Sequence, residues 1–175
     1  PTGFGRRYIA PLVAEFHKQH PQASISLNLS DNPIRLKPDA WDIVIHIGEL
    51  HSQPYQMAIL APNERILCAS PDYISRRGAP NSPAELTSHD CLALRENDED
   101  VTLWRFAQPG GKSEAVRIPD GVTCNDGDVI RDWALAGLGI ILRSEWDVAD
   151  DLASGHLMRL LPAWTTPQVP VVALL

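Results

Sequence analysis

The chain has 175 residues, of which 44% are hydrophobic and 21% charged, and its formal net charge is -7. This length and composition predict a globular chain of one or two compact domains. The negative charge argues against nucleic acid as a partner of this segment, since phosphate contacts need a basic face. No apolar run is long enough to predict a membrane span, and the first residues lack a signal-peptide pattern.

The first predicted element is an amphipathic helix from Phe4 to about His20, which Pro21 ends. Thr2 suits the N-cap, because its short side-chain oxygen can accept a free backbone N–H. One apolar stripe at a spacing of four predicts core packing, with a share of the stripe available to a partner subunit. The stripe consists of Phe4, Tyr8, Leu12 and Phe16.

Two strands are predicted next. Residues 24–30 alternate between polar and apolar side chains, which predicts a strand with one buried face. Residues 42–47 are nearly all apolar, which is typical of a buried parallel strand. Together with the preceding helix, these strands favour a parallel α/β layer.

The middle of the chain predicts a strand over 64–70 and a short helix over 71–77, with Pro71 at its first position. A strand over 103–106 precedes Gly110 and Gly111, which suit a hairpin turn. The last predicted elements are a helix over 144–153 and strands over 157–161 and 169–175.

The stretch 124–142 combines a strand end, a polar turn, a helix and a short buried strand. Asn125 or Asp126 suits the helix N-cap, and Gly137 suits the left-handed residue that ends a helix. Residues 140–142 are all apolar, as in a strand buried on both faces. A capped helix start beside strand ends is a place to hold a small anion or polar ligand.

No metalloprotease, phosphate-loop or nucleophile-elbow motif occurs, so we predict neither an enzyme nor a bound cofactor. His46 and His51 with Glu49 are a weak candidate metal set, and a hydrogen-bonded histidine is the ordinary alternative. Cys68, Cys91 and Cys124 are widely and irregularly spaced, which fits a reducing, cytoplasmic location. Cys124, beside a helix start, suits either a redox sensor or a small buried residue.

Several pieces of the chain, in their order and spacing, resemble the effector-binding domain of LysR-type transcriptional regulators. The matching pieces are 3–7, 10–16, 20–21, 42–50, 67–73, 125–127, 136–140 and 146–155. The resemblance implies an α/β fold of the type 2 periplasmic-binding-protein kind. In that fold two Rossmann-like subdomains are joined by two crossing strands, with a ligand cleft between them.

The resemblance places subdomain one at 1–64 plus 170–175 and subdomain two at 65–169. In the family the winged helix-turn-helix domain, which binds DNA, lies N-terminal to this region. We therefore expect that DNA-binding domain to be absent from this chain, along with the first strand of subdomain one and the helix that follows Leu175. DNA would be a partner only through the missing domain.

The resemblance also implies a set of effector-binding positions at the start of the first helix, after two strands and at the start of the helix near 127. They are Thr2, Gly3, Phe4, Gly48, Glu49, Ser70, Asn125 and Asp126. Arg143 follows the buried strand and suits either a carboxylate ligand or an ion pair with Glu145 or Asp147. Helix starts and this arginine favour a small carboxylate as the effector.

By the same resemblance, the effector would shift the equilibrium between subdomain arrangements and act through dimerisation on the DNA-binding heads. A homodimer or tetramer would form through helices 4–19 and 127–136. Two alternatives stay open: a solute-binding protein of a transport system, and a cysteine-based redox-sensing regulator of the same fold.

Overall fold

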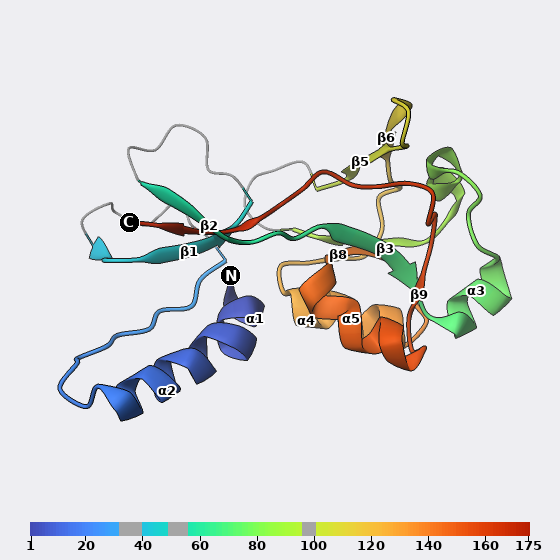
Figure 1. Cartoon of the computed structure of the whole chain (residues 1–175). Helices are drawn as coiled ribbons and strands as arrows, with labels where there is room; N and C mark the ends of the chain where they lie inside the picture. Colours follow the sequence, from blue (N-terminus) through green and yellow to red (C-terminus); the bar gives the residue numbers. More distant parts are fainter. Residues whose placement is uncertain (32–39, 49–55, 96–100) are drawn as a thin grey trace.

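The computed structural model describes residues 1–31, 40–48, 56–95 and 101–175. It opens with one continuous helix made of α1 (Thr2–Phe4), the π-helical η1 (Gly5–Ile9) and α2 (Ala10–Gln19). This helix runs away from the body of the molecule (Figure 1). Thr2 is already helical and its side chain makes no cap, so the predicted N-cap role of Thr2 is wrong. Its backbone N–H instead donates to Asp31 Oδ1 at 2.5 Å.

The apolar stripe of this helix is largely exposed. Leu12 and Phe16 are 65% and 50% exposed, and Tyr8 is 40% exposed. The stripe contacts the body of the molecule at its beginning, where the rings of Phe4 and Tyr8 contact the ring of Trp146. The prediction of core packing is therefore wrong for the outer half, where Leu12 and Phe16 are at least half exposed and Phe16 contacts the ring of His20 in its own segment.

A three-stranded sheet has the order β1 (Val44–Ile47), β10 (Val171–Leu174), β2 (Met57–Ala61), and both pairings are antiparallel. The predicted buried parallel strand over 42–47 thus becomes a half-buried strand antiparallel to β10. Residues 24–30 form no strand, so that prediction is wrong as well. Alternation alone does not make a strand, because a ladder needs a partner, and no described segment pairs with 24–30.

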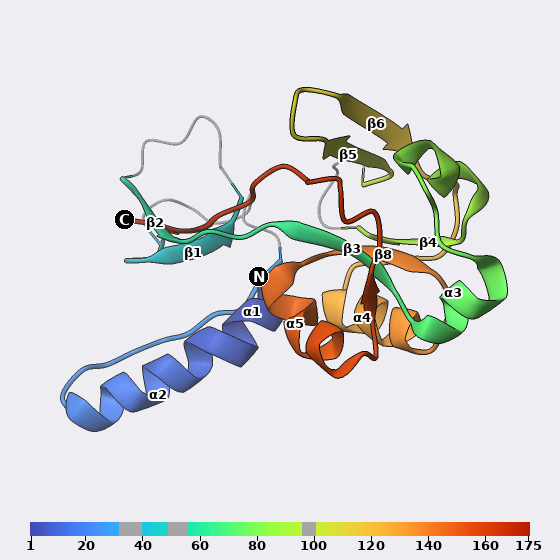
Figure 2. The same ribbon diagram turned by 45° about the vertical axis from the view of Figure 1, so that its right-hand side comes forward.

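A five-stranded mixed sheet has the order β7 (Thr123–Cys124), β4 (Cys91–Leu94), β8 (Ile140–Ser144), β3 (Arg65–Ala69), β9 (Met158–Arg159). The helices α4 (Gly127–Leu135) and α5 (Glu145–Ser154) cover one face (Figure 1). The hairpin of β5 (Leu103–Ala107) and β6 (Ser113–Arg117) lies over the other face, near the 3₁₀ helix η4 (Pro83–Ser88), as Figure 2 shows. The helix α3 (Pro71–Arg77) follows β3 directly.

Side-chain alternation along these strands divides the core into two layers. Ile66 and Cys68 of β3 pack with Ile141 of β8 toward α4 and α5, where Ile130 and Val148 are fully buried. The other layer, under the hairpin, includes Leu67, Ile140, Trp104, Phe106 and Trp164. The predicted buried strand at 140–142 is therefore confirmed, with Ile140 and Ile141 both 0% exposed.

Two chain segments run side by side between the sheets, one from β2 to β3 and one leading into β10. Val169 N–H donates to Asn63 O at 2.9 Å, and Asn63 Nδ2 donates to Val169 O at 3.0 Å. The buried Asn63 also donates to Ser144 Oγ at 3.1 Å. These bonds tie the paired segments to the end of β8, beside the site described next.

Candidate functional site

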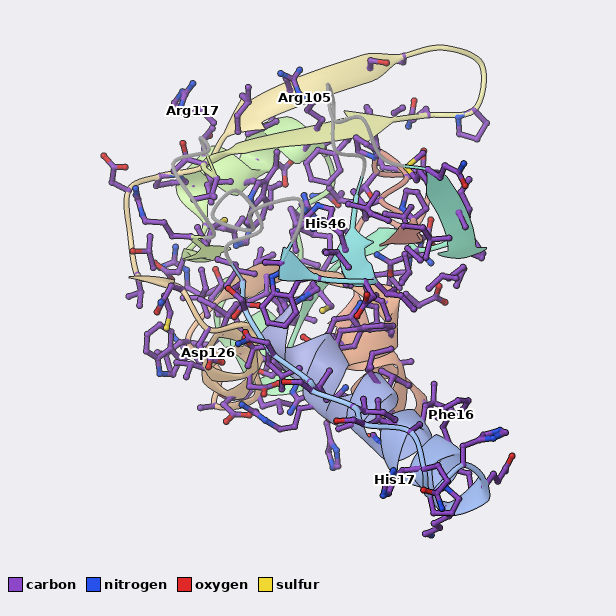
Figure 3. The ribbon with its side chains drawn as sticks, turned by 90° about the vertical axis from the view of Figure 1, so that its left-hand side faces the viewer. Phe16, His17, His46, Arg105, Arg117 and Asp126 are labelled. Atoms are coloured by element: carbon purple, nitrogen blue, oxygen red, sulfur yellow. The ribbon has the colours of Figure 1, made fainter. Side chains whose placement is uncertain are left out.

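A cavity of about 310 Å³ lies where the first helix, β1, the hairpin and the start of α4 come together. Its walls come from segments far apart in sequence, including Thr2, His46, Trp104, Asp126 and Arg143. Figure 3 shows His46 and Asp126 toward the body of the molecule, whereas Phe16 and His17 lie at the outer end of α2. The cavity is large enough for a small organic molecule.

The start of α4 forms one wall, and Asp126 is its N-cap, as the sequence predicts. Asp126 Oδ1 accepts from the backbone N–H of Asp128 at 2.9 Å and of Val129 at 3.2 Å. The same carboxylate therefore satisfies two of the free amides at this helix end. Gly137, with φ of +84°, ends the helical segment in the left-handed conformation, as predicted.

Arg143, on β8, is the cation of this cavity that the described residues hold most rigidly. Its side chain is only 10% exposed, and its Nε donates to Asp147 Oδ2 at 2.8 Å. Among the described residues, no hydrogen-bond partner is found for its two Nη atoms, and they are not sealed from solvent. The outer edge of the guanidinium is therefore available to a ligand.

Asp147 is fully buried and is shared by three guanidinium groups. Arg143, Arg131 and Arg7 approach its oxygens at 2.8, 3.2 and 3.5 Å. Because one carboxylate faces three cations, Asp147 does not neutralise Arg143 by itself. Arg7 belongs to the first helix, so the same cluster joins that helix to α4 and α5.

The acidic side chains around the cavity are already occupied. Asp128 pairs with Arg6 at 3.1 Å, and Asp31 accepts the Thr2 N–H. Asp126 is the helix cap. His46, on β1, has its pKa lowered by burial, so its imidazole is neutral at pH 7. Arg143 is thus the buried cation that the lining offers to an anionic group, beside the carboxylates of Asp31, Asp126 and Asp128.

Five of the residues expected at the site line the cavity: Thr2, Gly3, Phe4, Asp126 and Arg143. Gly48, Ser70 and Asn125 are not part of its lining. Ser70 is buried as the N-cap of α3, where its Oγ accepts the Tyr73 N–H. Glu49 lies outside the described residues, as does His51 of the weak metal set. The described residues contain no group of three or more histidine, cysteine or acidic side chains placed to hold a metal.

The cavity also contains residues that sequence reasoning missed. Trp146 and Arg105 both line it, next to His46, which the resemblance places near the cleft wall, and Figure 3 shows Arg105 on the hairpin side of His46. The hairpin is distant in sequence from the other walls, so no local sequence pattern indicates that its residues line the cavity. The sequence does give a signal for the Arg143–Asp147 pair, because Asp147 follows Arg143 by four residues and is one of its two candidate ion-pair partners.

A family model described as the LysR substrate binding domain matches residues 1–175. The transcriptional activator TtdR of Escherichia coli K12 is 38% identical over 162 residues, which cover 93% of this chain and 52% of TtdR. The regulator DmlR of the same strain is 35% identical over 165 residues, which cover 94% of this chain and 53% of DmlR.

Two solved structures show the same fold. CrgA of Neisseria meningitidis, a LysR-type transcriptional regulator, is 29% identical with a TM-score of 0.82, covering 98% of this chain and 57% of that protein. AphB, a Vibrio cholerae virulence activator, is 24% identical with a TM-score of 0.85, and the match covers 98% of this chain and 57% of AphB. The predicted fold of the type 2 periplasmic-binding-protein kind is thus confirmed.

The described part of the chain contains no helix with the length and apolarity to cross a membrane. The chain spans about half the length of the curated relatives it matches. It belongs to the LysR substrate-binding domain family, the effector-binding regulatory part of LysR-type transcriptional regulators.

Proposed function

We propose that this chain senses a small organic acid, whose carboxylate binds Arg143 in the 310 Å³ cavity. One observation carries the proposal: a guanidinium that is about nine-tenths buried and fixed at Nε, and whose Nη atoms have no hydrogen-bond partner among the described residues, lines the cavity. A carboxylate can accept both Nη–H groups in a two-point contact. Among the other expected residues, Thr2 and Phe4 lie on the facing wall and would contact the rest of the acid.

The division into subdomains forms part of the same proposal. Subdomain one comprises 1–64 with 170–175, and subdomain two comprises 65–169. The Asn63–Val169 bonds support this division, because they lie where the paired connections leave the five-stranded sheet. An acid that binds both walls of the cavity favours the arrangement in which the walls are close, by its difference in affinity for the two arrangements.

The whole regulator would pass this change on through self-association. The exposed stripe of Tyr8, Leu12 and Phe16 supports the first helix as one contact surface, with α4 as the other. DNA would be bound by a domain outside this chain, and the chain itself would act in the cytoplasm without catalysing a reaction. Leu12→Glu is expected to convert a dimer to a monomer in light scattering, whereas an unchanged mass would remove this surface from the proposal.

The geometry disfavours one form of the redox alternative, a disulfide between Cys68 and Cys91. Cys68 pairs with Ile141 and Cys91 with Ile140 on opposite edges of β8, so their Cα atoms are about 10 Å apart. A disulfide needs less than about 7 Å. Burial also raises the pKa of each thiol to about 12, which keeps both protonated at pH 7. Peptide mapping after peroxide treatment should show no disulfide between these cysteines.

The direct test is thermal unfolding of the chain with small organic acids and with their matched primary amides. An acid that binds the folded state at a hundred times its Kd adds about 2.7 kcal/mol of stability, and its amide should add almost none. Arg143→Met, which keeps length and loses charge, should abolish the response to acids. Equal stabilisation by acids and amides, or an undiminished response in Arg143→Met, would refute Arg143 as the anchor.

A further inference from the structure

Arg143 is held in place by two contacts outside the cavity, and neither partner has been assigned a role in ligand binding. Asp147 accepts the hydrogen bond from Nε at 2.8 Å, which occupies the Nε–H group. Gly127, the first residue of α4, lies directly against the flat group. A Cβ added to Gly127 would stand 2.7 Å from Cζ and 2.9 Å from Nη1 of Arg143, and nearer still to Nη2.

With the guanidinium in this position, residue 127 has no room for a side chain, and a larger residue there requires the end of the Arg143 side chain to move. Real Cβ atoms essentially never approach heavy atoms within 3.0 Å, so even a methyl group would displace the guanidinium. The backbone at this position does not require glycine, since Gly127 is not among the residues with positive φ. The absence of a side chain is therefore needed for the arginine and not for the helix, in which alanine is more favourable than glycine.

Asp147 restricts the remaining freedom of the same group. An arginine side chain has several rotatable bonds, and a two-point contact requires its fork to be fixed beforehand. The hydrogen bond from Nε–H to Asp147 fixes the orientation of the guanidinium plane. The contact with Gly127 limits how far the group can move toward the start of α4. The Nη atoms, which have no hydrogen-bond partner among the described residues, are then left for a ligand in the cavity that Arg143 and Gly127 line.

We propose that Gly127 and Asp147 are positioning residues of a carboxylate subsite centred on Arg143. This inference rests on the proposed function, and it adds that the subsite selects a planar group with two acceptor oxygens. Gly127 sets the position of the fork and Asp147 sets its orientation. A single-point cation in the same place would not distinguish a carboxylate from other anions in this way.

The test uses the 175-residue chain labelled with ¹⁵N-arginine and acetate as the probe. Acetate is small enough to reach any accessible fork, and the Nε–H resonance of Arg143 reports its contact with Asp147. We expect a saturable shift of this resonance with acetate and none with chloride at equal ionic strength. Gly127→Ala and Asp147→Asn should each weaken the acetate midpoint by about tenfold or more, as expected when hydrogen bonds to a charged group are lost.

The two variants separate positioning from folding. Asp147→Asn also affects Arg7 and Arg131, whereas Gly127→Ala disturbs only the contact with Arg143, so acetate binding by both variants is measured at a temperature at which each is folded. Asp150→Asn, an exposed carboxylate on the same helix, is the matched control and should bind acetate as the unmodified chain does.

Each contrary result has its own meaning. If Gly127→Ala and Asp147→Asn both bind acetate at Arg143 with the original midpoint, the positioning roles are refuted while the proposed sensor function stands. If acetate never shifts Arg143 although acids raise the melting temperature, the carboxylate subsite lies elsewhere and this inference is overturned. If acids neither stabilise the chain nor shift Arg143, the proposed function fails together with it.

Discussion

The two sheets of this molecule differ in how completely they are covered. Every residue of β2 in the three-stranded sheet is exposed, with Ile59 at 67% and Leu60 at 54%. In the five-stranded sheet, Cys68, Ile140 and Ile141 are all 0% exposed, because helices cover one face and the hairpin covers the other. An apolar groove of about 350 Å³ also lies in the first region, between residues 24–30 and 41–45.

This difference shows which part of the site is firmly built. Arg143, Gly127 and Asp147 belong to strand and helices around the five-stranded sheet, whose packing fixes their positions. The facing wall, from Thr2 to Phe4 and at His46, belongs to the less covered region. Anion recognition thus rests on the five-stranded region, and the cluster around Asp147 and the ring of Trp146 join the first helix to that region.

The largest expected effect comes from breaking that junction. Asp147→Ala leaves Arg143 and Arg131 without the buried carboxylate that both contact, and such a loss costs about 3–5 kcal/mol. Urea denaturation followed by circular dichroism measures the change, with Asp150→Ala as the exposed control on α5. A loss below about 1 kcal/mol, the range of exposed ion pairs, would show that the cluster does not hold the regions together.

A matched pair of isoleucine substitutions tests the contrast in packing directly. Ile141→Ala removes methyl groups from a fully buried site in the five-stranded sheet and should cost about 2–5 kcal/mol. Ile59→Ala, at a residue 67% exposed in the three-stranded sheet, should change stability by no more than about 0.5 kcal/mol. Both are read from urea midpoints. Similar losses for the two variants would mean that Ile59 is covered in solution, for example by a second copy of the chain.

The sequence predicted the five-stranded region far better than the three-stranded one, for a physical reason. The elements at 124–142 carry local signals, namely the Asp126 cap, the Gly137 stop and an apolar strand, and each signal acts within a few residues. Strand formation at 24–30 depends instead on a partner that no local pattern supplies. The prediction that the apolar stripe of the first helix packs in the core is wrong for a similar reason. Periodicity shows which face of a helix is apolar, but it does not show what covers that face.

The candidate site was only partly accessible to the same reasoning. Arg143 and Asp126 were found because a buried strand and a helix start are recognisable and place polar groups at their ends. Trp146 and the hairpin residues enter the cavity through tertiary packing between distant segments, which spacing does not encode. The fit of Gly127 against the arginine is a matter of tenths of an ångström, and only the folded chain shows it.

The smallest effect concerns pH. Burial lowers the pKa of His46, so the unfolded chain binds more protons than the folded chain once the pH falls below about 6.5. Stability should therefore decline as pH falls from that value through the folded-state pKa, by at most about 1.4 kcal/mol per pH unit for one group.

His89 acts in the same direction, because burial and Arg77 lower its pKa too. The His46→Gln and His89→Gln variants separate the contributions of the two histidines to the pH dependence of the free energy of unfolding. Each variant should flatten the acid side of the stability profile measured by urea denaturation. His46 lies in the less covered region and lines the cavity. An acid bound in the cavity should therefore change the contribution of His46 to the acid-side loss of stability, and it should leave the contribution of His89 unchanged. If His46→Gln leaves the acid slope unaltered, the imidazole is solvated in the folded chain and the wall at β1 is more open than the described contacts indicate.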